Sequence, residues 1–399
     1  MSASTHDVVV VGAGIVGLTA AWRARCAGAD VVVLDPAPGD GATHAAAGML
    51  APVLEAGFGE EGHARLGVAS LALWPAYAQD LEAAAGLPSG AVGLDTSGTL
   101  ALAYDADDRA ALRRTLALHS GWGLDSAEIG ADEARRREPG VGPRVTGAAW
   151  VPGDHRADPR AVHAALAAAV GPERVLRRTV TSLCWSGGRV TGATDDTGDT
   201  HRAATVVLAA GHASGRLFPG APTRPVLGTT LRLLADADRA PHVVVRGAVQ
   251  GRPVYAVPRA PRPDGSREVV VGATSDERAD DHLTRAGDVY ALLRDARVLL
   301  PGLDDAVLAE TTTRARPGTP DNAPLVGWAA DGLYVATGHH RNGVLLAPLT
   351  AAAVDHALGA RDPRAVAAAE AAARHADPTR YRRTRPADHP VGATEGGTA

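Results

Sequence analysis

Residues 7–36 contain the pattern that most restricts what this chain can fold into. An apolar β-branched run, Val8–Val11, leads directly into a complete G-x-G-x-x-G arrangement at 12–17. An alanine-rich segment of helical character follows, and a second apolar run, Val31–Leu34, ends on Asp35. Two strand-like runs around a helix, with the glycines at the first turn, predict a βαβ unit of the doubly wound α/β class.

The glycine positions predict dinucleotide binding. Gly12 permits a tight turn, Gly14 lets the backbone approach a pyrophosphate, and Gly17 lets the helix pack close to the strand. The helix N-terminus adds free N–H groups and the positive end of the helix dipole. Asp35 can accept both ribose hydroxyls of an adenosine, which argues against a 2′-phosphate and hence against NADP. The predicted binding segment is Gly12, Ala13, Gly14, Ile15, Val16 and Gly17.

Composition excludes several other functions. The net charge of −5 gives no electrostatic case for binding nucleic acid or an anionic membrane. The chain has no lysine, which excludes Schiff-base chemistry by a protein lysine. Cys26 and Cys184 are expected to be buried small apolar residues rather than a disulfide, a ligand pair or a redox couple, and no cluster has metal-ligand spacing. No apolar run reaches transmembrane length and no signal peptide precedes the first strand, so we expect a cytoplasmic protein.

The remaining pattern predicts two domains with an interleaved order. Helices are expected at 67–85, 105–122, 130–138, 158–170, 285–299 and 346–358. Strands are expected at 93–104, 147–152, 175–185, 189–194, 204–208, 227–234, 243–245, 254–258, 269–273, 309–315 and 333–336. We predict a nucleotide-binding domain built from 1–85, 150–215 and 316–375, an inserted domain built from 86–149 and 216–315, and a disordered tail at 376–399.

Three features have two interpretations each when residues alone are considered. The small residues of Ala45–Pro52 suit either a backbone lying against a large flat group or tight packing against a helix. Arg316, between a strand and a Pro-Gly loop, could bind a carboxylate through its planar fork, although a surface arginine is the commoner case. Tyr255 could donate a hydrogen bond to the same carboxylate, although a core aromatic residue is again commoner.

Several segments together carry a resemblance to a known family. They are VVVVGAGIVGLTAA from Val8, AAAGMLAP from Ala45, DPRAVHAAL from Asp158, VVLAAGHAS from Val206, PVLGTTLRL from Pro225, VYAVPR from Val254, VVVGATSDE from Val269, RARPGTPDNAPLVG from Arg314 and ATGHHRNGVLLAP from Ala336. In this order and spacing, the chain resembles the D-amino acid oxidase superfamily of FAD-dependent amine oxidases over about Val8 to Leu358, and within it the glycine oxidases of thiamine biosynthesis. The resemblance implies a Rossmann-like FAD-binding domain with an inserted α+β substrate domain on an antiparallel sheet.

The resemblance also implies roles for individual residues. Arg316 would grip the substrate carboxylate with help from Tyr255, and Arg341 would be the second arginine near the flavin. Met49 and Ala51 would border the substrate pocket. The family mechanism is hydride transfer to the flavin with the amine entering deprotonated, so neither neighbouring histidine is expected to act as a base. The implied contacts to the cofactor are Asp35, Thr43, Ala46, Ala47, Gly48, Met49, Val180, Ala210, Gly211, His339, His340, Arg341, Asn342, Gly343 and Val344.

The implied activity is oxidation of glycine or a small amine such as sarcosine, giving the imino acid or glyoxylate, ammonia and hydrogen peroxide. FAD is expected to be non-covalent, because neither cysteine falls in a segment near the flavin. Relatives suggest a homotetramer and a hand-off of the imine to thiazole synthase. The alternatives are a D-amino acid oxidase or amine dehydrogenase with another substrate, an NAD-dependent dehydrogenase, and a non-catalytic nucleotide-binding module.

Overall fold

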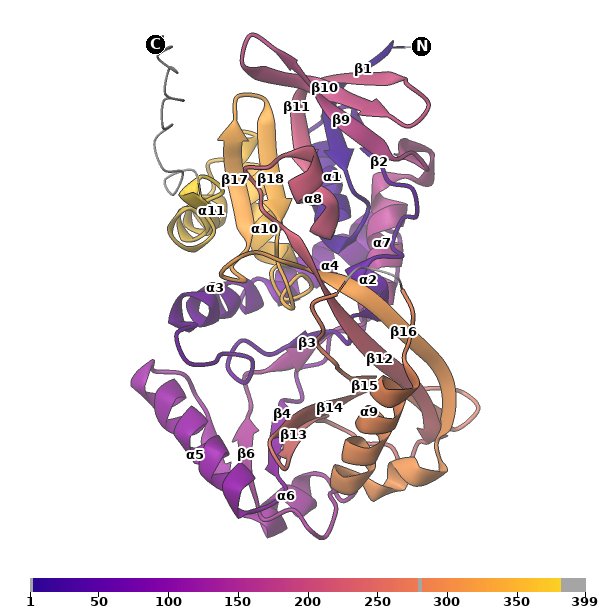
Figure 1. Cartoon of the computed structure of the whole chain (residues 1–399), viewed down its shortest axis with the longest axis vertical. Helices are drawn as coiled ribbons and strands as arrows, with labels where there is room; N and C mark the ends of the chain where they lie inside the picture. Colours follow the sequence, from indigo (N-terminus) through magenta and orange to yellow (C-terminus); the bar gives the residue numbers. More distant parts are fainter. Residues whose placement is uncertain (1–2, 279–281, 382–399) are drawn as a thin grey trace, which may run out of the picture.

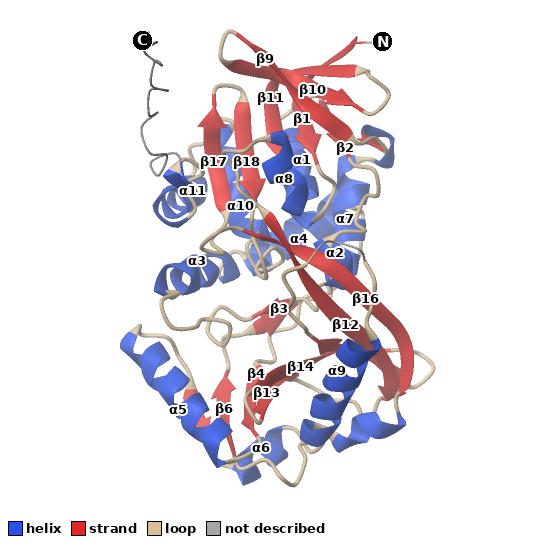
Figure 2. Ribbon diagram, in the orientation of Figure 1, coloured by secondary structure: helices blue, strands red, loops and turns tan. Residues whose placement is uncertain are grey.

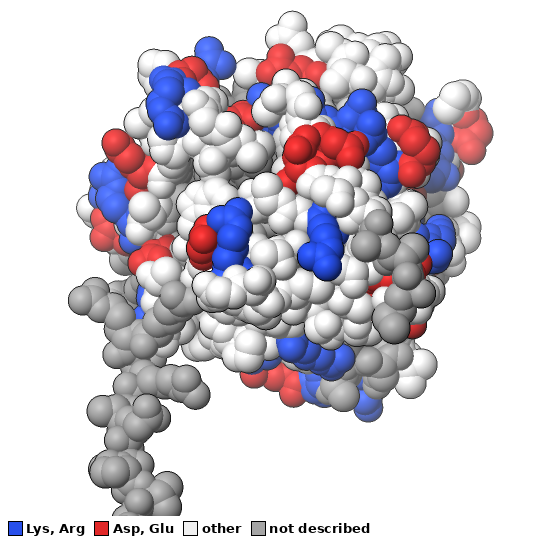
Figure 3. Space-filling view, turned by 90° about the horizontal axis from the view of Figure 1, so that it is seen from above, with Lys and Arg blue, Asp and Glu red and all other residues white. Residues whose placement is uncertain are grey.

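The computed structural model describes residues 3–278 and 282–381, which form two eight-stranded sheets and a two-stranded ribbon. The first sheet and its helices make up the upper half of Figure 1, and the second sheet makes up the lower half. On the face shown in Figure 3, arginine and acidic side chains are interspersed rather than segregated by sign.

The first sheet is mostly parallel and contains the predicted βαβ unit. Its central path runs β17-β18-β11-β1-β2-β8, with β9 and β10 attached as a hairpin beside β11. The strands are β1 (Ala3–Val11), β2 (Val31–Leu34), β8 (Val175–Leu176), β9 (Val180–Ser186), β10 (Arg189–Asp195), β11 (Thr200–Leu208), β17 (Leu325–Ala330) and β18 (Leu333–Thr337). The helices of this half are α1 (Ile15–Cys26), α2 (Ala42–Ala45), α3 (Glu61–Leu71), α4 (Trp74–Ala84), α7 (Pro159–Val170), α8 (Ser214–Leu217), α10 (Ala347–Ala357) and α11 (Pro363–His375).

The core of this half explains why the unit folds as predicted. All four residues of β2 are buried, as parallel strands covered on both faces require. Helix α1 packs against α7 and α10. Asp158 caps α7 by accepting the backbone N–H of Arg160 and Ala161, and Pro159 occupies the first turn. The strand ends therefore hold the loops after β1 and β2 at one edge of the sheet.

The second sheet is largely antiparallel, in the order β16-β12-β15-β14-β13-β4-β6-β5. Its strands are β4 (Thr99–Ala103), β5 (Ala127–Ile129), β6 (Gly147–Val151), β12 (Arg224–Asp236), β13 (Val244–Val249), β14 (Arg252–Pro261), β15 (Ser266–Gly272) and β16 (Val307–Gly318). Helix α9 (Ala286–Leu299) lies against β12 to β15, and α5 (Ala106–Gly121) lies against β4, β5 and β6, with α6 (Ala131–Arg137) near β6 (Figure 2). The ribbon pairs β3 (Met49–Leu50) with β7 (His155–Arg156) between the two halves.

Strand membership follows the interleaved order that the sequence predicts, with two strands crossing an expected boundary. Strand β6 ends at Val151 and β16 ends at Gly318, so each extends past the boundaries placed at 150 and 316. The division into two domains at those boundaries stays a prediction.

Three expected segments differ in the structure. The single strand expected over 175–185 is two strands, since β8 pairs with β2 and β9 pairs with β10. The single helix expected over 67–85 is two helices, α3 and α4, because Pro75 in the first turn of α4 starts a new helix. The predicted start of the disordered tail, at 376, lies too early in the chain. Val326 donates its backbone N–H to the carbonyl oxygen of Ala376, and the Arg380 guanidinium donates to the Asp321 carboxylate at 2.9–3.0 Å. The remainder of the expected tail, 382–399, lies outside the described residues.

Candidate active site

A cavity of about 590 Å³ lies at the carboxyl ends of the parallel strands β1, β2, β11 and β18, where the second sheet meets the first. This edge is where ligands bind in open α/β sheets, and the volume lies within the usual range for ligand sites. The predicted site residues that line it are Gly12, Gly14, Ile15, Val16, Asp35, Thr43, Ala46, Ala47, Gly48, Met49, Val180, Ala210, Gly211, Tyr255, Arg316, His339, His340, Arg341, Gly343 and Val344.

The glycines at one end of the cavity have distinct structural roles. Gly12 adopts φ +107°, a backbone conformation that favours glycine. An added Cβ on Gly17 would overlap the carbonyl oxygen of Gly12, so this glycine is needed for packing. An added Cβ on Gly14 would meet only the Thr43 hydroxyl, at 3.4 Å, so the backbone there is open to the cavity.

The start of α1 and Asp35 fit the adenosine and pyrophosphate of FAD. Helix α1 has Gly14 as its N-cap, a residue without a capping side chain, and no acidic residue in its first turn; among the described residues, only the N–H of Ile15 in that turn is bound by a side chain, at the Thr43 hydroxyl. That leaves the positive end of the helix available to an anion. Each Asp35 oxygen accepts one backbone N–H, from Ala13 and from Ala37, both at 2.7 Å. A carboxylate oxygen has room for a second donor, so the ribose hydroxyls can still be accepted.

Arg316 lies at the other end of the cavity, on β16. Its Nη1 donates to the carbonyl oxygens of Thr274 at 3.1 Å and Leu227 at 3.4 Å, and no carboxylate forms an ion pair with it within the described chain. Burial lowers the pKa of Arg316. An added Cβ on Gly228 would overlap the guanidinium, so this glycine on β12 makes room for it. A half-buried guanidinium without an acidic partner is suited to binding a carboxylate.

Tyr255 lies close to Arg316, and the pKa of each is influenced by the other. Burial raises the pKa of the Tyr255 phenol, so it remains protonated and can donate a hydrogen bond. An added Cβ on Gly272 would overlap the ring, so this neighbour on β15 must be small. The structure therefore brings together the two groups that the sequence interpretation assigned to one carboxylate.

The histidines after β18 are poor proton acceptors. His339 is buried and its Nε2 lies 3.1 Å from the hydroxyl of Thr350; burial lowers its pKa to about 4. Burial, followed by the charges of Arg341 and Arg316, lowers the pKa of His340 to about 3. Both imidazoles are therefore neutral and weakly basic near neutral pH, as expected for residues that do not act as a base.

Four of the predicted contact residues do not line the cavity: Ala13, Gly17, Ala51 and Asn342. The first two support the turn, through the N–H bonded to Asp35 and through close packing on Gly12. Ala51 is buried beneath the wall, and Asn342 lines a small adjacent pocket instead.

Sequence interpretation missed several lining residues. These include Asp40, Glu55, Arg216, Gly228, Thr230 and Arg314. Glu55 pairs with Arg246 of β13 at 3.1 Å, and its only sequence signal is a single acid following the apolar residues 45–54.

Neither cysteine lines the cavity: Cys26 is on α1 and Cys184 is on β9. The expectation that both are buried is wrong, because Cys26 is exposed at the last residue of α1 and Cys184 is only half-buried. This arrangement favours FAD held without a covalent bond. No helix within residues 3–278 and 282–381 is both long and apolar enough to cross a bilayer.

Comparisons with known proteins agree with this geometry. Residues 7–357 match the family of FAD dependent oxidoreductases (DAO). The glycine oxidase of Geobacillus kaustophilus is 31% identical over 358 residues, which cover 86% of this chain and 90% of the relative. The bifunctional protein ThiO/ThiG of Nostoc is 34% identical over 361 residues, covering 88% of this chain; the chain spans about half of that relative's length, 52%.

Solved structures give the same result. The crystal structure of glycine oxidase from Geobacillus kaustophilus superimposes with a TM-score of 0.77 at 29% identity, covering 88% of this chain and 95% of that one. The fold is thus the one predicted, a Rossmann-like FAD-binding domain joined to a part built on a largely antiparallel sheet. With the family match over most of its length and a cavity that fits FAD, the chain belongs to the FAD-dependent oxidoreductases of the D-amino acid oxidase family.

Proposed function

We propose that this protein oxidises glycine and small amines such as sarcosine, with dioxygen as the final electron acceptor. The imino acid formed from glycine either leaves or hydrolyses with water to glyoxylate and ammonia (methylamine in the case of sarcosine), and dioxygen is reduced to hydrogen peroxide. The observation that carries the proposal is the Arg316 guanidinium, which lines the cavity beside the Tyr255 hydroxyl and has no carboxylate partner of its own within the described chain. The names of the glycine oxidase relatives support the choice of substrate.

The chain's own residues supply positioning rather than proton transfer. The fork of Arg316 and the hydroxyl of Tyr255 hold the substrate carboxylate, which fixes the α-carbon next to it. FAD, held by the turn at residues 12–17 and by Asp35, would supply the acceptor for the two electrons that leave with the α-carbon hydride when the amine becomes an imine. Because His339 and His340 are weak bases, the amine enters the site already deprotonated.

Arg316→Ala tests the proposal. Losing a charge-assisted, bidentate contact of about 3 kcal/mol raises KM for glycine by about 100-fold, while the variant keeps its yellow colour. Arg316→Lys retains the positive charge without the planar fork, so its KM for glycine should lie between those of the parent and Arg316→Ala. A KM within threefold of the parent would show that the carboxylate is held elsewhere.

A substrate panel with peroxide detection identifies the amine and the acceptor. We expect glycine and sarcosine to give peroxide with the highest kcat/KM, ahead of larger D-amino acids. Amine turnover that needs an artificial electron acceptor, with no peroxide formed, would indicate a dehydrogenase instead.

We also propose that the imine passes to a thiazole synthase. The relatives named bifunctional ThiO/ThiG, of which this chain spans about half, support this partnership. Adding a purified thiazole synthase with its other substrates should lower the glyoxylate released per peroxide formed; an unchanged ratio would contradict the proposed hand-off.

The expected homotetramer is tested by light scattering, as a mass near four times 40.6 kDa.

A further inference from the structure

One face of β16 links the substrate end of the cavity to its cofactor end. Side chains alternate along a strand, so Glu310, Thr312, Arg314 and Arg316 point to the same side of β16. Arg316 lines the cavity. The other two charged residues on this face contact the segment 40–47 or the residue that holds it.

Segment 40–47 forms one wall of the cavity and is held by the second sheet at two points. Arg314 donates from Nε to the carbonyl oxygen of Asp40 and from Nη2 to its carboxylate, both at 2.6 Å. Thr230 of β12 donates to the carbonyl oxygen of Ala45 at 3.1 Å. The segment also reaches the helix start, since the Thr43 hydroxyl accepts the N–H of Ile15 at 3.0 Å.

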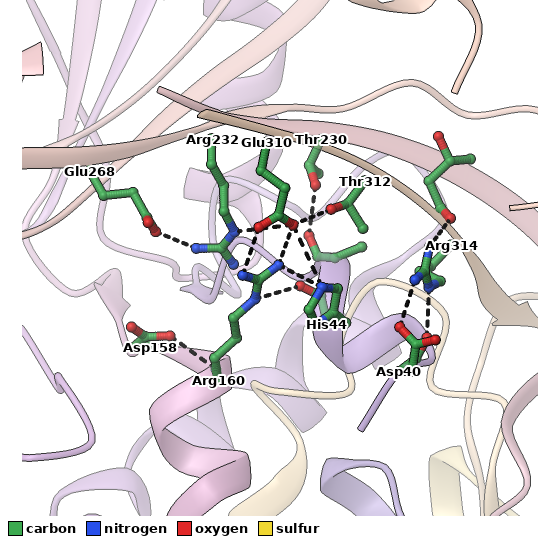
Figure 4. A network of polar contacts seen from close by, with 12 residues as sticks. Asp40, His44, Asp158, Arg160, Thr230, Arg232, Glu268, Glu310, Thr312 and Arg314 are labelled. Carbon is green, nitrogen blue, oxygen red and sulfur yellow. Dashed lines mark hydrogen bonds and ion pairs between the residues drawn. The ribbon is translucent and has the colours of Figure 1, made fainter. Parts of the chain in front are cut away.

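The third and most extensive contact to segment 40–47 involves Arg160 and Glu310, drawn in Figure 4. The two side chains form a bidentate ion pair, with N–O distances of 3.0 and 2.5 Å. Arg160 also donates from Nε to the carbonyl oxygen of His44 at 3.2 Å, and its Nη2 lies 2.9 Å from His44 Nε2. Residues 41–43 and 45–47 line the cavity, whereas His44 faces this cluster instead.

The cluster is arranged to keep Glu310 ionised and fixed. Arg160 holds the pKa of Glu310 down to about 2, and the Thr312 hydroxyl donates to the same carboxylate. Arg232 pairs with Glu268 and lies 3.9 Å from Glu310, and Arg262 also pairs with Glu268 at 3.1 Å. Arg160 itself is anchored at the start of α7, where Asp158 accepts its backbone N–H at 2.9 Å.

We propose that Glu310 and Arg160 are positioning residues for the cofactor. They clamp segment 40–47 between α7 of the first half and β16 of the second, and so set the position of its cavity wall relative to Arg316. The expected effect on FAD binding depends only on membership of the FAD-dependent family. The expected effect on amine turnover rests on the proposed function.

Glu310→Gln tests the clamp with a readout that needs no substrate. We expect the dissociation constant for FAD, measured by flavin fluorescence on the apoprotein, to rise about tenfold. The matched control is Glu128→Gln: Glu128 is also paired with arginines and equally exposed (34% against 32%), but it lies on β5 at the opposite edge of the same sheet. The control should bind FAD within twofold of the parent.

A double-mutant cycle separates the clamp from a general loss of structure. Arg160→Gln and the double variant with Glu310→Gln should each weaken FAD binding about as much as Glu310→Gln alone, because the pair acts as a unit. The circular dichroism of the three apoproteins should match that of the parent. If Glu310→Gln does not fold, Thr312→Val, which removes only the hydroxyl donated to Glu310, should still raise the FAD dissociation constant about threefold.

Unchanged FAD affinity in folded Glu310→Gln, or in folded Thr312→Val where the former does not fold, would overturn the inference. Equal weakening in Glu128→Gln would also overturn it.

A second readout is kcat for glycine at saturating FAD, which we expect to fall about fivefold in Glu310→Gln while KM changes less than twofold. Because FAD binding is measured without amine, a wrong substrate assignment would leave the first readout intact.

Discussion

The two ends of the cavity are built in opposite ways. At the end where the cofactor is expected, the turn at residues 12–17 and Asp35 lie inside one βαβ unit, and other segments, including Val180 and Gly211, complete the lining. At the substrate end, Arg316 and Tyr255 are side chains from β16 and β14, with space made by Gly228 of β12 and Gly272 of β15. The first end depends on a local turn, whereas the second exists only when distant strands pair in register.

This difference implies that the two ends of the cavity can be altered separately. Altering the turn affects the fold of the first half as well as the cofactor, because the same glycines pack the helix on the strand. Replacing Gly228, which lies against the Arg316 guanidinium, should move that side chain and leave the strands of the second sheet paired. Substitutions at the two ends should therefore differ in kind, not only in size.

The largest effect is expected from Gly17→Ala. The new methyl group would overlap the carbonyl of Gly12, so we expect a loss of about 3 kcal/mol in unfolding free energy and no retained FAD. Urea denaturation and the absorbance of the purified protein measure these two outcomes.

Gly14→Ala is the matched control for that change. Its methyl group meets only Thr43, so the apoprotein should keep its stability within about 0.5 kcal/mol while FAD binds about 100-fold more weakly. Equal destabilisation of both variants would mean that Gly14 serves packing as well.

At the substrate end, Gly228→Ala should leave FAD bound and disturb only the amine. The added methyl group displaces the Arg316 guanidinium, so we expect KM for glycine to rise about 30-fold, or about 2 kcal/mol, with the flavin absorbance unchanged. Steady-state peroxide formation measures KM. Loss of FAD from this variant would contradict the separation of the two ends.

A pH effect is expected from Asp154, a buried carboxyl that accepts the N–H groups of Val53 and Leu54. Burial raises its pKa to about 7 from an ordinary value of 3.8. The folded protein therefore binds an extra proton between these values, and the stability this provides is complete below pH 4 and lost as pH rises through 7.

Asp154→Asn keeps an acceptor oxygen but cannot ionise. The difference in unfolding free energy between parent and variant should shift in favour of the variant by up to about 2.7 kcal/mol from pH 5 to pH 9, because about two of the three pH units of the shift lie above pH 5. Urea denaturation at both values measures it. A difference that stays constant with pH would show that Asp154 does not titrate in this range.

The smallest effect is expected from Cys26→Ser combined with Cys184→Ser. Because neither cysteine lines the cavity, acid precipitation should release all of the flavin from the parent and from the variant alike. Flavin that stays with the precipitated parent and not with the variant would indicate a covalent bond.

The same contrast sets how much the sequence could predict. The turn at 12–17 and Asp35 were predictable because glycine requirements and hydrophobic periods are local. Arg316 and Tyr255 are assigned by family resemblance, since residues alone favoured a surface arginine and a core aromatic residue. Glu55 was missed because only folding brings Arg246 of β13 to it. The ordered stretch up to Arg380 was missed because its partner, Asp321, is distant in sequence.

Anaerobic addition of amines to the purified yellow protein tests the central claim most directly. The claim is that a carboxylate held by Arg316 places a small amine against the cofactor. Glycine should bleach the flavin absorbance within seconds at millimolar concentration, whereas glycinamide, which lacks the carboxylate, should require at least about 100-fold more. Bleaching by both amines at equal concentration, or by neither, would contradict the account.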